Sequence, residues 1–463
     1  MSLSMSAKPA CFKAYDIRGR VPDELDEELA RCIGLAFAEQ LRPRRVVVGY
    51  DIRLSSPALA VAVGQGLQAA GVEVLELGQC GTEEVYFATA HLEADGGIMV
   101  TASHNPADYN GMKLVREGAQ PVSGDSGLDR IGEAALQFYQ KTRRPVVADE
   151  AAASGSSRLV DPRPAYLEHL LSYIDPAGLK PLTIVANPGN GGAGAIIDQL
   201  AARLPFTFIR LQWEADGRFP HGVPNPLLPE NRAATAEAVR RHRADLGLAW
   251  DGDFDRCFFF DEQGNFIEGY YLVGLLAEAI LARQPGAKII HDPRLVWNTR
   301  EIVSRAGGIP VLCKTGHAFI KERMRAEDAV YGGEMSAHHY FREFFYCDSG
   351  MIPWLLLTAL LSRGDAPLSQ LVSARQAAFP VSGEINRRVA EPAAAIARVK
   401  KWCRQFPGDF DDTDGLSFEA ADFRCNLRSS NTEPVLRLNV ETRRDPVLLA
   451  KITDQLLQLI ENG

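Results

Sequence analysis

Apolar strands and amphipathic helices alternate along most of the chain. Three times, an apolar run ends in a polar turn, an amphipathic helix follows, and a second apolar run opens into a loop crowded with functional groups. The paired runs are 46–50 with 97–100, 182–186 with 246–250, and 287–290 with 329–331. This alternation predicts three similar α/β domains with mixed, largely parallel sheets. The three copies show no convincing residue identity, which makes the repeat topological.

Two stretches have the composition of linkers, namely 149–157 and 362–380. After the second, the pattern changes to a strand, a helix over 393–406, further strands and a final helix over 446–460, which predicts an α+β domain. We therefore expect an α/β fold of four domains, with α/β domains over 1–157, 158–262 and 263–377 and a C-terminal α+β domain over 378–463.

Composition excludes several classes of protein. The chain has 463 residues and a net charge of −9, which disfavours a broad basic face for nucleic acid. Its longest apolar runs are far too short to span a membrane, and charged residues interrupt the N-terminal region where a secretory signal would lie. We therefore expect a cytoplasmic protein. The eight cysteines include no CxxC pair, which argues against a disulfide framework or a zinc site.

The loop that follows the strand over 97–100 contains Thr-Ala-Ser-His-Asn-Pro, with Lys113 ten residues beyond Ser103. A serine at the end of a buried strand, with cations within reach, is a plausible phosphoryl acceptor, because the phosphoryl oxygens need nearby donors. The alternative is a turn whose serine and asparagine side chains bind backbone groups.

Three aspartates alternate in the loop after the strand over 246–250, at Asp251, Asp253 and Asp255. Carboxylate oxygens favour Mg²⁺ or Ca²⁺ over Zn²⁺. An EF-hand would place Glu262 at its twelfth position, but Arg256 replaces the glycine needed at the sixth. A strand-borne Mg²⁺ site is therefore favoured over a solvated acidic turn.

Gly189, Gly191 and Gly194 match the GxGxxG pattern of dinucleotide-binding proteins. The acidic residue expected about twenty positions later is missing, since Ile209, Arg210 and Leu211 stand there. A tight strand-to-helix turn is the preferred interpretation.

Three further loops carry weaker signals. Gly333-Glu-Met-Ser336 offers a carboxylate and a hydroxyl suited to the vicinal hydroxyls of a sugar, and Lys314-Thr-Gly-His317 adds a cation and an imidazole. Arg428 and the Ser-Ser-Asn-Thr run after it could bind a dianionic phosphate, although a solvated hairpin loop is equally plausible.

Together and in this order, the loops resemble those of the α-D-phosphohexomutase superfamily, specifically its bacterial phosphomannomutase/phosphoglucomutase branch. The resemblance rests on YDIRG at 15–19, TASHNP with YNGMK downstream, DGDFDR, KTGH, GEMS and SNTEP, and covers nearly the whole chain. GEMS selects the branch, because phosphoglucosamine mutases usually carry GEQS and the larger phosphoglucomutases GEES. The resemblance implies four domains around one deep cleft, each contributing one loop.

The resemblance also assigns roles to residues. Ser103 would be the phosphoserine and would complete a Mg²⁺ site made by Asp251, Asp253 and Asp255. Arg18 and Lys113 would handle the proton of the reacting hydroxyl and the phosphoryl charge, beside His104 and Arg256. The remaining expected substrate-binding residues are Tyr15, Arg294 and His317, then Glu334 and Ser336 for the 3- and 4-hydroxyls of the sugar, and Arg428, Ser430, Asn431 and Thr432 for the phosphate that does not react.

The activity implied is reversible phosphoryl transfer between hexose 1-phosphate and hexose 6-phosphate, for mannose and glucose, with a hexose 1,6-bisphosphate as intermediate and activator. We expect small phosphosugars as partners, no nucleic acid or membrane, a monomer, and opening of the fourth domain at 362–380. Four alternatives remain: a phosphoglucosamine mutase, a phosphatase with a phosphoserine intermediate, a nicotinamide-dependent oxidoreductase, and a non-catalytic phosphosugar-binding protein.

Overall fold

The structure is a computed structural model, and it describes residues 8–142, 155–429 and 435–461. The chain forms two compact units. The first comprises residues 1–264 and 343–363, and the second comprises residues 265–342 and 364–463.

The larger sheet of the first unit has the strand order β1-β5-β4-β2-β3-β7, with β6 paired to β5. Strands β4, β2, β3 and β7 are parallel, and β5 runs antiparallel to both β4 and β1. The elements of this part are β1 (Ile17–Arg20), α1 (Glu27–Leu41), β2 (Arg45–Tyr50), α2 (Ser56–Ala69), β3 (Glu73–Gln79), α3 (Thr82–His91), β4 (Gly96–Val100), β5 (Tyr109–Arg116), β6 (Gln120–Pro121), α4 (Asp129–Thr142) and β7 (Ser157–Leu159).

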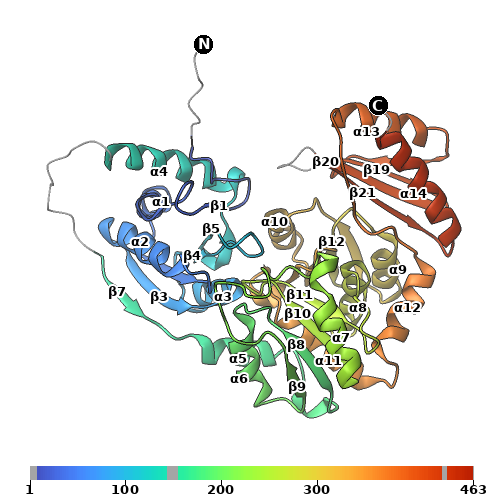
Figure 1. The fold of residues 1–463 in the computed structure, drawn as a ribbon, viewed down its shortest axis with the longest axis horizontal. Helices are drawn as coiled ribbons and strands as arrows, with labels where there is room; N and C mark the ends of the chain where they lie inside the picture. Colours follow the sequence, from blue (N-terminus) through green and yellow to red (C-terminus); the bar gives the residue numbers. More distant parts are fainter. Residues whose placement is uncertain (1–7, 143–154, 430–434, 462–463) are drawn as a thin grey trace. The chain divides into compact units, whose positions relative to one another are not determined.

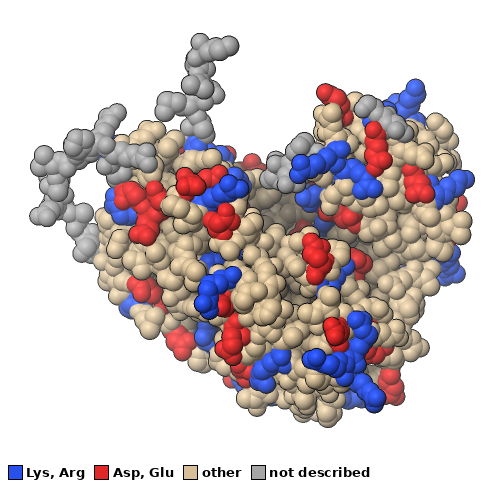
Figure 2. Space-filling view, in the orientation of Figure 1, with Lys and Arg blue, Asp and Glu red and all other residues tan. Residues whose placement is uncertain are grey.

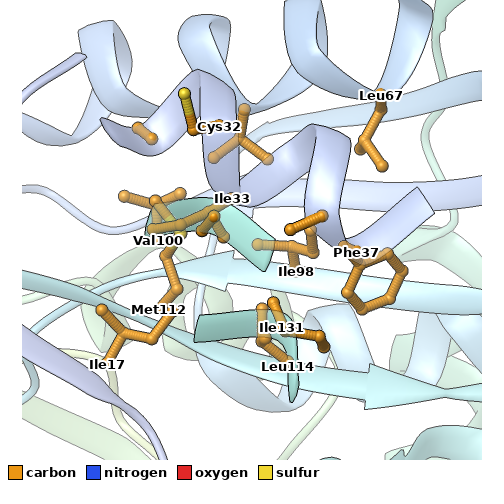
Figure 3. Packing of buried hydrophobic residues seen from close by; sticks show 14 of the residues in the cluster. Ile17, Cys32, Ile33, Phe37, Leu67, Ile98, Val100, Met112, Leu114 and Ile131 are labelled. Carbon is orange, nitrogen blue, oxygen red and sulfur yellow. The ribbon is translucent and has the colours of Figure 1, made fainter. Parts of the chain in front are cut away.

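Helices α1, α2 and α4 cover one face of this sheet, and α3 covers the other (Figure 1). Ile33 and Phe37 of α1 lie in one buried cluster with Ile98 of β4 and Leu114 of β5 (Figure 3). Each fully buried side chain of this size stabilises the fold by about 1.5–3 kcal/mol. The core therefore fixes the strands whose ends carry the loops discussed below.

The second sheet of the first unit has the order β11-β10-β8-β9, in which β8 is parallel to β9 and β10, and β11 is antiparallel to β10. The remaining elements of this unit are α5 (Arg163–Leu171), β8 (Thr183–Asn187), α6 (Ala193–Ala201), β9 (Thr207–Arg210), α7 (Ala233–His242), β10 (Leu246–Trp250), β11 (Cys257–Phe260), β16 (Cys347–Asp348) and α11 (Ile352–Arg363).

The second unit contains a mostly parallel sheet with the order β13-β12-β14-β15 and an antiparallel sheet with the order β17-β21-β20-β19-β18. Its elements are α8 (Gly269–Leu281), β12 (Lys288–His291), α9 (Trp297–Arg305), β13 (Ile309–Leu312), α10 (His317–Glu327), β14 (Tyr331–Gly333), β15 (His339–Phe341), α12 (Leu368–Ala378), β17 (Ile385–Arg388), α13 (Pro392–Cys403), β18 (Gly408–Asp411), β19 (Leu416–Ala420), β20 (Phe423–Ser429), β21 (Val435–Thr442) and α14 (Pro446–Glu461).

The three parallel sheets share one connection pattern. From β2 the chain passes to β3 on one side and then to β4 on the other, and the same reversal occurs for β8, β9 and β10 and for β12, β13 and β14. Loops beyond the carboxyl ends of the strands diverge at such a reversal and leave room for a ligand. This explains why the loops after β4, β10 and β14 contain the candidate functional groups. The predicted α/β class, with its three α/β sheets and a C-terminal α+β part, is confirmed.

Two details of the sequence interpretation are wrong. The strand expected over 329–331 is β14, which begins at Tyr331 and ends at Gly333. The segment 362–380 is no simple linker, since it contains helix α12, whose Leu368 and Val372 are buried. Pro367 immediately before this helix made the segment resemble a loop. The other expected linker, 149–157, lies largely outside the described residues, and its last residue begins β7.

Acidic and basic side chains are interspersed on the face of the molecule shown in Figure 2, in keeping with the modest net charge. None of the helices in the described residues is long and apolar enough to cross a membrane. All eight cysteines are buried and free, as expected from their spacing.

Candidate functional site

Ser103 lies in the loop after β4 with a φ of 47°, in the left-handed region that a residue other than glycine adopts at a cost. The loop is held in place by Arg53, which follows β2 and is 1% exposed. Its guanidinium donates to the carbonyls of three loop residues, Ser103 (2.8 Å), Asn105 (2.6 Å) and Pro106 (2.7 Å), and to that of Tyr109 at the start of β5 (3.0 Å). The neighbouring structure therefore stabilises the unusual backbone and fixes the direction of the serine side chain.

The Ser103 hydroxyl meets the loop after β10. Its Oγ lies 2.9 Å from Oδ2 of Asp251, 3.1 Å from Nδ1 of His104 and 3.3 Å from Nη2 of Arg256. Arg256 also donates to Oδ2 of Asp251 from Nε (2.8 Å) and from Nη2 (2.6 Å). The close approach of the two loops requires glycine at 252, where a Cβ atom would lie 2.8 Å from the Ser103 carbonyl oxygen.

Asp251, Asp253 and Asp255 are buried, and one carboxylate oxygen from each lies within 4.8 Å of the others. Lys113 Nζ donates to Asp253 (2.7 Å) and to Asp255. Burial favours the neutral amine, but these two carboxylates raise the pKa of Lys113, which remains a cation. Burial, and then the neighbouring Asp253 carboxylate, raises the pKa of Asp255 to about 7.

The donor set of this cluster suits a hard divalent cation. All three side chains offer oxygen, which Mg²⁺ and Ca²⁺ prefer. Oδ1 of Asp253 is buried and has no hydrogen-bond partner among the described residues. An unpaired buried carboxylate oxygen is costly, so a bound cation would complete its interactions.

Arg18 and His104 lie at the same centre. Arg18, on β1, donates from Nη1 to the Thr101 carbonyl (3.0 Å) and from Nε to Asp16 (2.9 Å). Burial, and then the charge of Arg256, lowers the pKa of His104 well below its usual range, so the imidazole is neutral. Tyr15 is half-buried and precedes β1.

A second cluster lies in the second unit, around the loops after β12 and β14. Arg294 forms a bidentate ion pair with Asp292, through Nε (3.1 Å) and Nη2 (2.8 Å), and Nη2 also donates to Ser336 Oγ (3.3 Å). Glu334 accepts from Tyr340 (2.6 Å), from His338 (3.1 Å) and from the backbone N–H of Gly316 (3.2 Å). Burial acts against the anion, yet His338 and Arg294 lower the pKa of Glu334 to about 2, so it is a carboxylate.

His317 begins α10, directly after the glycine whose N–H meets Glu334. Arg428 lies near the end of β20, and its Nη2 is 3.2 Å from Oε2 of Glu384. The other expected phosphate-binding residues, Ser430, Asn431 and Thr432, lie outside the described residues.

The GxGxxG segment forms the turn between β8 and α6, as the preferred interpretation expects. A Cβ atom at 191 would lie 2.8 Å from the Pro188 carbonyl oxygen and 3.1 Å from that of Gly252. The glycines therefore let this turn pack beside the aspartate loop, which accounts for them without a dinucleotide.

Sequence reasoning missed several residues of both clusters. Thr82, the first residue of α3, donates to Oδ2 of Asp253 (2.5 Å) and lies 3.3 Å from Lys113 Nζ. Arg53, Asp292 and Tyr340 were also overlooked. Asp292 directly follows β12, and Arg53 lies in the loop after β2, so a search of every strand end would have found both. That search also corrects the assumed lack of residue identity, because Asp51-Ile-Arg53 and Asp292-Pro-Arg294 occupy equivalent strand ends.

Comparisons with known proteins match nearly the whole chain. Profiles of phosphoglucomutase/phosphomannomutase alpha/beta/alpha domains I, II and III match residues 9–137, 164–264 and 268–379, and the profile of the C-terminal domain matches residues 384–459. A protein of Xanthomonas campestris described as phosphohexose mutases is 62% identical over 453 residues, covering 97% of this chain and 98% of that protein. A phosphomannomutase of Salmonella montevideo is 60% identical over 460 residues, covering 98% and 99%.

Solved structures share the fold. A phosphoglucomutase/phosphomannomutase family protein from Burkholderia thailandensis superimposes with a TM-score of 0.85 at 33% identity, covering 99% of each chain. An N-acetylphosphoglucosamine mutase from Aspergillus fumigatus, solved with GlcNAc-6P and magnesium, superimposes with a TM-score of 0.62 at 13% identity, covering 99% of this chain and 97% of that one.

Proposed function

Because the chain belongs to the phosphoglucomutase/phosphomannomutase family and is a hexose phosphate mutase, we propose that it interconverts the 1- and 6-phosphates of mannose and glucose through a phosphoserine at Ser103. The observation that carries the proposal is the position of Ser103, which is strained, buried and in contact with Asp251, His104 and Arg256. The description of the family, the name of the Salmonella relative and the GEMS sequence at 333–336 favour mannose and glucose as the sugars.

The chemistry follows from charge and proton balance. In the first transfer, the bond between phosphorus and Ser103 Oγ breaks while a bond forms from phosphorus to the free hydroxyl of the phosphosugar. The proton lost by that hydroxyl ends on Ser103 Oγ, where Asp251 and His104 are placed to accept a hydrogen bond from it. The product is a hexose 1,6-bisphosphate, and return of its other phosphoryl group to Ser103 restores the enzyme.

The cations around Ser103 neutralise the phosphoryl group as it moves. Phosphoryl transfer passes through a loose transition state that is stabilised mainly by charge and alignment. Arg256 lies 3.3 Å from the Ser103 hydroxyl, and Lys113, a cation, is bound to Asp253 and Asp255. Asp251, Asp253 and Asp255 would hold a Mg²⁺ ion, which supplies Lewis-acid stabilisation of phosphoryl oxygens when bound.

The second cluster would bind the sugar and the phosphate that does not react. Glu334 and Ser336 provide a carboxylate and a hydroxyl for sugar hydroxyls, and Arg294 lies beside both. Arg428 would bind the non-reacting phosphate, together with Ser430, Asn431 and Thr432. His317 and Tyr15 are further substrate contacts in this proposal.

The proposal is tested first by intact-mass spectrometry of the purified protein. A species heavier by one phosphoryl group is expected in the wild type and in Ser172→Ala, a control serine on the surface of the first unit, but not in Ser103→Ala. Mannose 1-phosphate and glucose 1-phosphate should both be converted, with stimulation by glucose 1,6-bisphosphate. A phosphoryl group on another residue, or net release of inorganic phosphate, would contradict the mechanism.

A second arm tests the metal. Chelation should abolish turnover and Mg²⁺ should restore it, and addition of Mg²⁺ to the chelated protein should raise its melting temperature. An Asp253→Asn variant should lose this thermal response. Full activity in a metal-free sample would overturn the assignment of the three aspartates.

A further inference from the structure

Glu384 lies directly before β17 and faces three arginines of the second unit. Its Oε2 is 3.2 Å from Nη2 of Arg428 and 3.5 Å from Nη1 of Arg294, and its Oε1 is 3.5 Å from Nη1 of Arg437. Burial would raise the pKa of Glu384, but Arg294, Arg428 and Arg437 lower it, so the side chain is a carboxylate. This residue has no role in the function proposed above.

Two of these arginines are the ones assigned to the substrate. Arg428 is mostly buried, and its nearest carboxylate besides Glu384 is Asp414, at 3.9 Å. Nε of Arg428 is buried and has no hydrogen-bond partner among the described residues. Glu384 is therefore the principal counter-ion of Arg428, and it joins this guanidinium to Arg294 through a single oxygen.

We propose that Glu384 is a positioning residue that competes with the phosphate of the substrate for Arg428 and thereby limits how tightly that phosphate is held. The inference rests on the proposed function, in which Arg428 binds the non-reacting phosphate. A carboxylate and a phosphate present similar pairs of oxygens to a guanidinium. A phosphate that binds Arg428 therefore displaces Glu384 from the guanidinium and is repelled by the nearby carboxylate.

Such competition serves the reaction. In the proposed function, the phosphate site at Arg428 must hold one end of the sugar during the first transfer and the other end during the second. The bisphosphate must leave this site between the two transfers, so a very tight grip would slow turnover. A carboxylate that returns to Arg428 neutralises the guanidinium while the site is empty and so favours release.

The opposite role is also physically possible. Glu384 could only pre-organise Arg428 and Arg294, in which case its loss would weaken phosphosugar binding, because the guanidiniums would lose their alignment. The two roles differ in the sign of the effect, which makes them separable by one substitution.

The experiment measures binding of mannose 6-phosphate by calorimetry in proteins that carry Ser103→Ala, so that no transfer occurs. Glu384→Gln keeps the shape of the side chain and removes its charge, and we expect about threefold to tenfold tighter binding. Glu461→Gln, which removes a carboxylate paired with Arg387 on the same sheet, is the matched control and should bind as the parent does. Mannose without phosphate should show no difference between the variants.

In the protein with Ser103 intact, Glu384→Gln should lower KM for mannose 1-phosphate by a similar factor and should also lower kcat. A loss of stability would not lower KM, so this result would distinguish the proposed role from a structural one. Glu384→Asp moves the carboxylate away from Arg428 and should also tighten binding, but by a smaller factor. This variant replaces Glu384→Gln in the experiment if the glutamine variant folds poorly. Unchanged or weaker binding in Glu384→Gln overturns the inference. Absence of phosphosugar binding in the Ser103→Ala parent would instead contradict the proposed function.

Discussion

The loops after β2 and after β12 begin with the same motif, Asp-x-Arg, and use it differently. In both, the aspartate accepts from the backbone N–H of the arginine at 3.0 Å, in the pairs Asp51 with Arg53 and Asp292 with Arg294. Each aspartate also anchors the loop of the neighbouring parallel strand, since Asp51 accepts from Thr101 Oγ1 (2.7 Å) and Asp292 from the N–H of Met335 (2.8 Å). The aspartate therefore connects two neighbouring loops in both regions.

The two guanidiniums meet different partners. Arg53 donates to four backbone carbonyls in and directly after the Ser103 loop, which no substrate can replace. Arg294 lies beside the side chains of Ser336, Glu334 and Glu384, all of which can change partner when a ligand arrives. The comparison shows that one motif can hold the backbone of a loop in one region and lie among polar side chains in another.

The largest effect is expected for Arg53→Lys. A lysine cannot reach four carbonyls at once, and each lost hydrogen bond from a charged donor costs roughly 1.5 kcal/mol or more. We expect a loss of about 3 kcal/mol in the free energy of unfolding and a fall in kcat of about 1000-fold, because the Ser103 loop relaxes. Chemical denaturation and steady-state kinetics measure both. Arg203→Lys, at a surface ion pair with Glu168, is the control and should change neither.

The same substitution at Arg294 should mainly affect binding and should cost less stability than Arg53→Lys. Lysine keeps the charge beside Asp292 and Glu334 but loses the forked geometry suited to a phosphosugar. We expect KM for mannose 1-phosphate to rise about 10-fold to 100-fold, with a melting temperature that falls less than in Arg53→Lys. A melting temperature that falls as far as in Arg53→Lys would remove the distinction between the two regions.

The strand ends were predictable, and their partners were not. Ser103 and the three aspartates could be located because hydrophobic patterning marks β4 and β10, and because loops at the carboxyl ends of parallel strands hold ligands. Thr82 contacts Asp253 across 171 positions of sequence, a pairing that only the packing of the two sheets creates. Glu384 likewise stands in a segment without a recognisable motif.

The expected linker over 362–380 shows the limit of composition as a guide. Its proline and small polar residues are typical of a loop, but the burial of Leu368 and Val372 stabilises helix α12. The Asp-x-Arg identity was missed for the opposite reason, because two matching residues are too few to stand out until the topology aligns them.

A smaller effect is expected for Thr82→Val, which tests whether α3 helps to position Asp253 beside the Ser103 loop. Valine keeps the shape of the side chain and removes the hydroxyl that donates to Asp253 and lies beside Lys113. Partners of this kind orient metal ligands, so we expect kcat to fall about 10-fold to 100-fold with little change in KM. Thr89→Val on the same helix removes a hydroxyl that donates only to the Val85 carbonyl and should leave kcat unchanged. Equal effects of the two substitutions would show that Thr82 acts only through helix stability.

The smallest difference is expected between two substrates of the second region. Mannose and glucose differ only at C2, whereas the resemblance assigns Glu334 and Ser336 to the 3- and 4-hydroxyls that both sugars share. Strong discrimination between two substrates usually requires a buried polar group that one of them leaves unpaired. No residue is assigned to the C2 hydroxyl, so neither sugar is expected to leave such a group unpaired. We expect kcat/KM for the two 1-phosphates to agree within about 100-fold, which is about 2.7 kcal/mol. Galactose 1-phosphate, inverted at C4, disturbs the contact with Glu334 and Ser336 and should be much poorer than either. Steady-state kinetics on the three sugars decides the matter, and galactose performing as well as mannose would show that recognition does not pass through these two residues.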